Sequence, residues 1–449
     1  MLKALSRLQG HPSLAVFVNS ISTLMIKIVS AGLIYAMFVL LARVTTVAEF
    51  GKFGVGFNLA SFLAIIASCG VHVGINRWWP EYLAKSQPRL ASASFFWGLR
   101  VTVIASVGLA TATAALIGTF AAISGAVDYY LIAAGALLIP LALADYLANT
   151  LRSQGSIWWA QLPKDVLWRL IGCGIAIYIA LNSEQLTASD ALWLLALSLA
   201  LLTMIQLVMA ARTARAVVAN DSSLLDATTE RATWIATSGP LWGGALLAAM
   251  VQYIDVLLVG AFVSVEKSAE YFAAVRTVNI IGLMHVAATL VCAPIISRTV
   301  HSNQLAELQH IFKVVAALVG VSTLVIILML LVLGPFLLSL FGPAFDGGYP
   351  ILIILAVGFG FNAVCGPVGY LLMLSGNERD YLRILFVCNS VGLVIQCVLI
   401  PLIGAIGAAI GSAAALIVSG IWARKVAVEK IGVDPTLFCL FSPRHSQEK

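Results

Sequence analysis

Residues 314–340 read VVAALVGVSTLVIILMLLVLGPFLLSL, a stretch without a single charged side chain. A helix needs about 20 mostly apolar residues to cross the hydrocarbon core of a bilayer, and this stretch exceeds that length. Lys313 precedes it directly, as is typical of a helix end at the cytoplasmic surface. The sequence therefore predicts a membrane-spanning helix over residues 311–340.

The rest of the chain has the same character. Of its 449 residues, 61% are hydrophobic and only 10% are charged, with a mean hydropathy of +1.00. Soluble proteins are about 25% charged, so this chain has too little polar surface to coat a water-soluble globule. We expect an all-α polytopic membrane protein with about twelve transmembrane helices. The predicted helices cover residues 15–42, 53–79, 95–124, 129–151, 158–181, 190–213, 235–262, 269–297, 311–340, 349–374, 380–402 and 404–427.

The distribution of Lys and Arg supports this count. Most of the 26 basic residues fall on alternate connections, and cytoplasmic loops are the ones enriched in Lys and Arg. The predicted external side holds only Arg43, Lys52, Lys267 and Arg276. Both termini are therefore expected in the cytoplasm. The net charge of +6 follows from this topology, so it gives no reason to expect nucleic acid as a partner.

Six helices in each half predict two six-helix bundles around a central cavity, related by an axis along the membrane normal. Short sequence echoes at matching positions support this: Leu151-Arg152-Ser153-Gln154-Gly155 ends one predicted helix and Leu374-Ser375-Gly376-Asn377 ends its counterpart. The expected divisions are an N-terminal lobe (1–214), a cytoplasmic linker (215–234), a C-terminal lobe (235–428) and a cytoplasmic tail (429–449). Gly407 and Gly411 form a pattern of small residues suited to close helix packing.

Motifs for catalysis or cofactor binding are not found in the sequence. The seven cysteines form no CxxC pair and do not cluster with histidines, so we expect no disulfide framework, metal site or redox centre. No GxxxxGK[ST] nucleotide-binding loop occurs, which argues against direct ATP drive. We expect no cofactor and no enzymatic activity.

Lys27 lies about midway along the first predicted helix. A cation at that depth costs about 2.5–3.5 kcal/mol by insertion scales. We favour a cationic cavity that binds an anionic substrate. The alternative is a lysine paired with a carboxylate or with carbonyls to lock two helices together.

Four residues of the second half complete the candidate site, with Arg77 from the first. Asp255, with Gln252 one turn before it, is a candidate coupling carboxylate that binds a proton or sodium ion; the alternative is a salt bridge to Arg276 or Lys27. Arg276 and Asn279 share a helix face and suit phosphate oxygens; the alternative for Arg276 is an interface anchor at the helix end. Arg77 is placed to guard a cytoplasmic mouth, and a positive-inside anchor explains it equally well.

We expect a further set of polar residues to hold two helices together rather than to bind a substrate. Asp145, Asn149 and Arg152 share one face of a predicted helix, and Lys164, Asp165 and Arg169 begin the next one. We expect an ion-pair network that holds these two helices together near the cytoplasmic side.

Several segments resemble a known family. Glu49-Phe50-Gly51-Lys52-Phe53-Gly54 and Gly70-Val71-His72-Val73-Gly74-Ile75-Asn76-Arg77 are similar to the first two helices of Wzx-type bacterial polysaccharide flippases, in the multidrug/oligosaccharidyl-lipid/polysaccharide (MOP) exporter superfamily. Tyr271-Phe272-Ala273-Ala274, Leu340-Phe341-Gly342-Pro343-Ala344-Phe345 and Pro401-Leu402-Ile403-Gly404 extend the resemblance over nearly the whole chain. About twelve helices argue against the fourteen-helix lipid II flippase branch, and Lys27 departs from the acidic residue typical of the drug-extruding branch.

The resemblance implies a bacterial inner-membrane flippase for oligosaccharides linked to undecaprenyl diphosphate, working by alternating access. It implies membrane lipids and a polysaccharide polymerase machinery as partners, in exopolysaccharide, capsule or O-antigen synthesis. It also implies a cavity lined by the helices that carry Lys27, Arg77, Asp255 and Arg276. The alternatives are a cation-coupled multidrug exporter of the same superfamily, a membrane polysaccharide polymerase or ligase, and a scaffold for glycan assembly.

Overall fold

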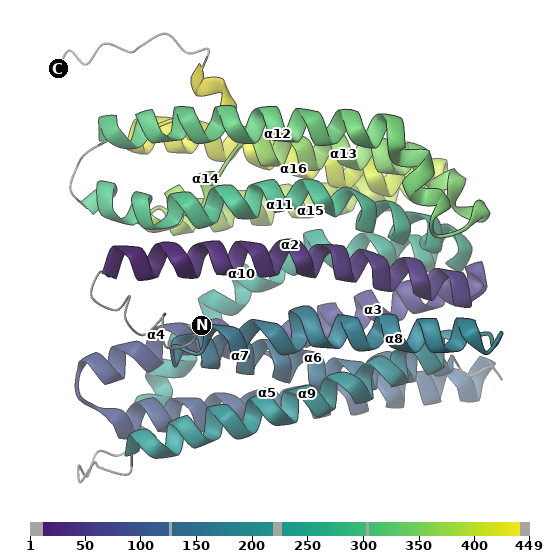
Figure 1. Cartoon of the computed structure of the whole chain (residues 1–449), viewed down its shortest axis with the longest axis horizontal. Helices are drawn as coiled ribbons and strands as arrows, with labels where there is room; N and C mark the ends of the chain where they lie inside the picture. The colour runs from purple at the N-terminus through teal and green to yellow at the C-terminus, as the bar shows by residue number, and fades with distance from the viewer. Residues whose placement is uncertain (1–11, 125–127, 219–226, 302–304, 441–449) are drawn as a thin grey trace. The chain divides into compact units, whose positions relative to one another are not determined.

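The computed structural model describes residues 12–124, 128–218, 227–301 and 305–440, and these residues are almost entirely helical with no β-strand among them (Figure 1). The α-helices are α2 (Pro12–Val44), α3 (Val47–Ala67), α4 (Val71–Ala84), α5 (Pro88–Ser124), α6 (Tyr129–Ser153), α7 (Ile157–Leu162), α8 (Trp168–Leu181), α9 (Ala188–Val218), α10 (Ala227–Phe262), α11 (Val265–His301), α12 (Leu305–Ser339), α13 (Tyr349–Val364), α14 (Val368–Leu374), α15 (Glu378–Ile403) and α16 (Ala405–Ile431). A π-helix, η2 (Pro163–Leu167), and two 3₁₀ helices, η3 (Pro343–Gly348) and η4 (Leu437–Leu440), complete the described elements.

Eleven helical stretches of the described residues are long and apolar enough to cross a membrane. The predicted helix over 158–181 is not among them because η2 divides it into α7 and α8, each too short to be counted. The helical backbone nevertheless continues from Ile157 to Leu181 without a break. The all-α, polytopic fold predicted from the sequence is confirmed.

Two predicted helices, 53–79 and 349–374, are wrong as single helices, because each is broken at a left-handed glycine. Gly70 (φ +76°) separates α3 from α4, and a Cβ there would lie 2.4 Å from the carbonyl oxygen of Ser238 in α10. Gly366 (φ +62°) separates α13 from α14, and a Cβ there would lie 2.6 Å from the carbonyl oxygen of Pro435. Only glycine combines this backbone conformation with such close approach.

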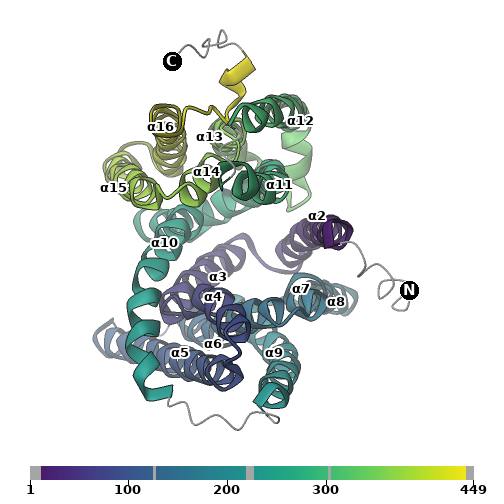
Figure 2. The same ribbon diagram turned by 90° about the vertical axis from the view of Figure 1, so that its left-hand side faces the viewer.

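The chain forms two compact units, which are described separately. Unit 2 runs from Gly32 to Ala269, and unit 1 combines the residues up to Ala31 with those from Glu270 onward. In unit 2, α3, α4, α5 and α9 all pack on α6 (Figure 2), whose Ala133, Ala134 and Ala142 are fully buried. Small side chains let the neighbouring backbones approach α6 closely, as is common in membrane bundles.

Helix α10 packs within unit 2, against α3 and α4. Its Trp234 donates a hydrogen bond from Nε1 to the hydroxyl of Tyr82 (2.8 Å), and that hydroxyl donates to Glu230 Oε2 (3.1 Å). The ring of Trp234 also contacts that of Trp97, with 5.3 Å between centroids. These contacts fix the first turns of α10; of the predicted linker 215–234, only residues 219–226 lie outside the described residues.

In unit 1, α15 and α16 form an antiparallel pair that depends on the glycines singled out in the sequence. A Cβ on Gly407 would lie 2.6 Å from the carbonyl carbon of Leu399, and one on Gly411 would lie 3.0 Å from the carbonyl oxygen of Gly392. The close packing predicted for Gly407 and Gly411 is therefore confirmed.

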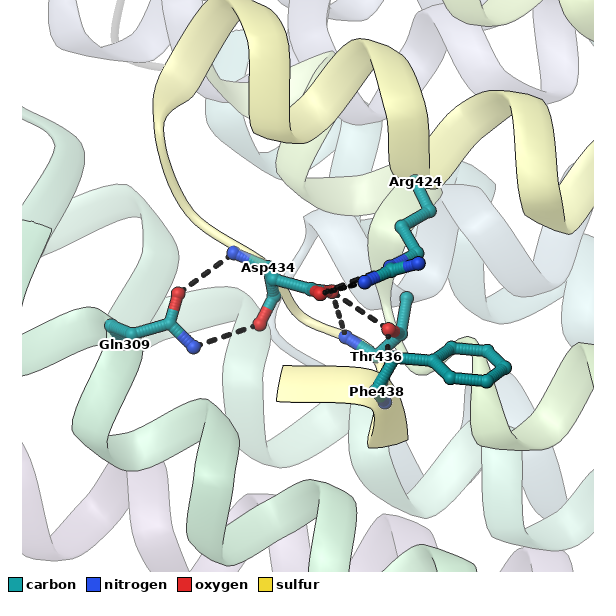
Figure 3. A network of polar contacts seen from close by, with 5 residues as sticks. All are labelled: Gln309, Arg424, Asp434, Thr436 and Phe438. Atoms are coloured by element: carbon teal, nitrogen blue, oxygen red, sulfur yellow. Dashed lines mark hydrogen bonds and ion pairs between the residues drawn. The ribbon is translucent and has the colours of Figure 1, made fainter. Parts of the chain in front are cut away.

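Residues 432–440 fold back over the ends of α12 and α16, and we call this segment the C-terminal clasp. Arg424 donates two hydrogen bonds to Asp434 Oδ2 (2.9 and 2.8 Å), while Asp434 Oδ1 accepts from the Thr436 backbone and hydroxyl (Figure 3). From α12, the amide of Gln309 bonds both the backbone N–H (2.7 Å) and the carbonyl (2.9 Å) of Asp434. The first half of the predicted tail 429–449 is thus an ordered part of unit 1, and residues 441–449 lie outside the described residues.

The two sequence echoes fold into the same turn. Gly155 after α6 and Gly376 after α14 both adopt left-handed conformations (φ +83° and +79°). Each helix end carries the same bond across five residues, from Ser156 N–H to the Leu151 carbonyl and from Asn377 N–H to the Leu372 carbonyl, both at 2.8 Å. This bond is typical of the Schellman motif, in which the left-handed residue after the helix is usually glycine.

Candidate functional site

The predicted site residues fall in both units. Lys27 lies in the part of α2 that belongs to unit 1, where it is partly buried among the exposed apolar residues Met25, Ile28 and Val29. Arg276 and Asn279, also in unit 1, are partly buried on α11. The guanidinium of Arg276 lies 4.6 Å from the ring centroid of Phe272, one turn earlier, and this cation–π contact orients it.

Asp255 and Gln252 lie on α10 in unit 2, one turn apart. Asp255 is buried, with 7% of its surface exposed, whereas Gln252 is exposed. A buried carboxylate in a membrane-spanning helix is costly and therefore a candidate for function.

Arg77 is the outermost of the predicted residues, with 70% of its side chain exposed. Its Nε lies 3.6 Å from Glu81, whose carboxylate also accepts from Lys85 at 2.7 Å. The side-chain hydrogen bond from Lys85 is the main reason that the pKa of Glu81 lies below its usual value. Arg77 therefore belongs to a surface ion-pair group at the end of α4.

The structure gathers a second set of polar side chains in unit 2, which we call the unit-2 polar cluster. Lys164 donates a hydrogen bond to the carboxylate of Asp145 and so joins η2 to α6. Asn149 Oδ1 accepts from Asn76 Nδ2 on α4 and from Arg152, both at 2.9 Å. His72, one turn before Asn76, lies within electrostatic range of Asp145 and Lys164. The members of this cluster are His72, Asn76, Asp145, Asn149, Arg152 and Lys164.

The predicted ion-pair contact between these helices is confirmed by the Asp145–Lys164 pair, whereas Asp165 and Arg169 pair with each other within the second segment. The contributions of His72 and Asn76 were not predicted. Their position one turn apart was visible in the sequence, but the break at Gly70, which resets the helical phase of α4, was not.

A π-helical turn presents Lys164 to Asp145. Pro163 has no N–H, so it cannot bond the carbonyl of Trp159 four residues earlier. Instead, the buried side chain of Gln206 in α9 donates to that carbonyl at 2.9 Å, and the Trp168 N–H bonds the Pro163 carbonyl five residues back. Such single π turns inside α-helices occur frequently at functional sites.

Within the described residues, no group of three or more His, Cys, Asp or Glu side chains is arranged to hold a metal ion. The unit-2 polar cluster instead combines one ion pair with amide groups. Such a set of groups can bind and orient a polar ligand through hydrogen bonds.

Comparisons with known proteins show to which family the chain belongs. The model of the family described as "Polysaccharide biosynthesis protein" matches residues 16–300, more than half of the chain. A comparison with curated proteins finds no match.

The fold is similar to that of several solved transporters. An inward-facing multidrug resistance MATE family transporter of the MOP superfamily is 14% identical with a TM-score of 0.71, over 89% of this chain and 96% of that chain. The lipid II flippase MurJ in an inward closed conformation is 13% identical with a TM-score of 0.63, over 93% and 88%. The Vibrio cholerae MATE transporter VcmN in its bent form is 15% identical with a TM-score of 0.54, over 93% and 97%.

Identities this low show the fold alone, whereas the family model matches the sequence itself. Together they give one conclusion. The chain belongs to the polysaccharide biosynthesis protein family, and it is a multi-pass membrane protein with the fold of the MOP superfamily transporters.

Proposed function

We propose that this protein is a flippase that translocates undecaprenyl-diphosphate-linked oligosaccharide repeat units across the bacterial inner membrane. The observation that carries this proposal is the family match over residues 16–300 in a chain that also has the fold of a lipid II flippase. A fold shared by exporters and a flippase favours movement of a substrate by alternating access over covalent chemistry.

In this proposal the diphosphate is attracted by cations on membrane helices. Lys27, midway along its predicted helix, and Arg276, at the predicted external side with Asn279 beside it, supply positive charge and hydrogen-bond donors to the diphosphate. Arg77 contributes at the cytoplasmic mouth, where it is exposed. The prenyl tail stays in lipid, so its apolar surface is never transferred to water.

Asp255 and Gln252 are the proposed coupling group. A buried carboxylate on a spanning helix can bind a proton or sodium ion on one side of the membrane and release it on the other. One charge moving through 100 mV supplies about 2.3 kcal/mol. We propose the predicted lobes, 1–214 and 235–428, as the halves of the internal repeat, with both termini in the cytoplasm.

Purified protein in liposomes tests the proposal. A fluorescent polyprenyl diphosphate bearing a disaccharide is placed in both leaflets, and the fraction bleached by an external reductant reports its movement. We expect complete bleaching with protein and about half without it. Bleaching that stays at half with active, correctly inserted protein would reject the proposal.

A cation-coupled multidrug exporter remains the second candidate, because the fold is also that of a MATE transporter. Cationic dye efflux from the same liposomes under a sodium or proton gradient distinguishes the two. The exporter predicts dye efflux without lipid movement, and the flippase predicts the reverse.

A further inference from the structure

The unit-2 polar cluster is partly exposed, although three of its members, Asp145, Asn149 and Arg152, lie on the membrane-spanning helix α6. The side chain of Asp145 is 37% exposed and that of Lys164 is 23% exposed. Charged groups facing hydrocarbon are strongly disfavoured, so this side of unit 2 must face water or a polar ligand. The cluster is therefore accessible to a substrate that is itself polar.

The Asp145–Lys164 pair at the centre of the cluster is neutral, and Arg152, the remaining cation, is exposed and donates a hydrogen bond to Asn149 Oδ1 at 2.9 Å. Lys164 is neutralised by Asp145, and the neighbouring groups Asn76, Asn149 and His72 carry amides or an imidazole. A diphosphate carries about two negative charges, which the single surplus charge of Arg152 does not neutralise. The cations proposed for the diphosphate, Lys27 and Arg276, belong to unit 1. The chemistry of the cluster thus fits an uncharged partner.

Hydrogen-bonding capacity in the cluster exceeds what its own members use. Among the described residues, no group donates to the carboxamide oxygen of Asn76, whose amide nitrogen already donates to Asn149 and weakly to the His72 carbonyl. The buried Nδ1 of His72 has no hydrogen-bond partner in the part of the chain that is described. Lys164 keeps ammonium hydrogens beyond the one given to Asp145. Sugar hydroxyls, which both donate and accept, match this mixture of groups.

We propose that the unit-2 polar cluster is a sugar-binding subsite, which hydrogen-bonds hydroxyl groups of the transported glycan. The inference rests on the proposed function, and it assigns the neutral part of the substrate to a defined set of side chains. Gln206 acts as a positioning residue, because its bond to the Trp159 carbonyl maintains the π turn that carries Lys164.

Asn76→Ala is the most direct variant, because it removes an amide without touching the Asp145–Lys164 pair. Asn182→Ala is the matched control: Asn182 ends α8 in the same unit, and its amide bonds only the Tyr178 carbonyl four residues back. The probes are a short-chain prenyl diphosphate bearing one N-acetylhexosamine and the same prenyl diphosphate without sugar. Their dissociation constants are measured by calorimetry on purified full-length protein.

We expect Asn76→Ala to weaken binding of the sugar-bearing probe on the order of fivefold, with the sugarless probe unchanged. Asn182→Ala should alter neither constant. Should Asn76→Ala not yield folded protein, the neutral double variant Asp145→Asn/Lys164→Met replaces it, with the same selective loss expected.

Failure of the inference is distinguishable from failure of the proposed function. If wild-type protein binds both probes and the cluster variants weaken both equally, or neither, the sugar-binding subsite is refuted while the flippase stands. If wild-type protein binds neither probe, the proposed function fails and the subsite with it.

Discussion

Gln206 donates a hydrogen bond to the backbone carbonyl of Trp159, 2.9 Å away, which is the carbonyl that Pro163 leaves without its helical partner. Helix α9 thus supplies a donor to the carbonyl that a proline in the neighbouring helix leaves without one, directly before the π turn Pro163–Leu167.

Replacing Gln206 with Leu should destabilise the protein by about 1–3 kcal/mol, since the Trp159 carbonyl would lose the buried amide that donates to it. The measurement is thermal unfolding in detergent by tryptophan fluorescence. Thr203→Val is the control, because the Thr203 hydroxyl bonds only the Ala200 carbonyl of its own helix. Equal midpoints for Gln206→Leu and wild type would show that the π turn does not need this bond.

The Asp145–Lys164 pair should show strong energetic coupling. Lys164→Met leaves a carboxylate without its cation, and Asp145→Asn leaves the lysine without its anion. The double variant should therefore be less destabilised than the sum of the single variants, by about 0.5–3 kcal/mol. A double-mutant cycle on unfolding midpoints measures this coupling, and additive effects would contradict a structural role for the pair.

Asp434→Ala should loosen the C-terminal clasp. It removes a two-bond contact with Arg424 and two bonds to Thr436, and we expect a loss of about 2 kcal/mol, because Arg424 remains 36% exposed. Limited proteolysis should then release the C-terminal residues sooner than in wild type. Lys425→Ala, which disrupts only an exposed pair with Glu429 at 3.9 Å, is the control expected to behave as wild type.

The thiol of Cys439 in the clasp should be slow to alkylate. Burial, reinforced by the negative charge of Asp434, raises its pKa to about 11. The thiolate is the reactive form, so its fraction at pH 8 falls to about 0.1%, against about 10% for a thiol of pKa 9.

Mass spectrometry after iodoacetamide treatment measures this rate in native and denatured protein. We expect native alkylation to accelerate as the pH rises toward 11. The unfolded chain loses this proton first, near pH 9, so the contribution of the neutral thiol to stability should decline between about pH 9 and 11. Similar native and denatured rates at pH 8 would contradict the buried position.

Lys27→Ala tests the predicted cationic site directly. Loss of the cation should lower movement of the disaccharide-bearing lipid in liposomes by about tenfold or more, since charge-assisted contacts to phosphate are among the stronger hydrogen bonds. Lys52→Ala, which removes a surface pair with Glu49, serves as the control. Normal lipid movement at normal protein levels would remove Lys27 from the mechanism.

The sequence was sufficient for features that depend on local composition. The length of the apolar stretches predicted the spanning helices, and the sharing of a helix face by Asp145, Asn149 and Arg152 predicted an ion-pair contact with the next segment, which Asp145 and Lys164 make. The breaks at Gly70 and Gly366 were not predicted, because their cause is distant in sequence: the carbonyls of Ser238 and Pro435 approach them from other segments. The bond from Gln206 to Trp159 escaped prediction for the same reason. The roles of Lys27, Arg77, Asp255, Gln252, Arg276 and Asn279 stay predictions.

The anchoring of α10 by Tyr82 and Trp234 affects how this protein can be divided. Residues 219–226 lie between the two predicted lobes. A gene split there separates α10 from the bundle on which it packs. Of two co-expressed fragments divided at that point, the N-terminal one would lack α10, and the C-terminal one would carry α10 without its packing partners α3 and α4. A cut after Phe262 keeps the whole of α10 with its packing partners α3 and α4, because the compact unit that contains α10 extends to Ala269, one helix beyond the end of the predicted N-terminal lobe.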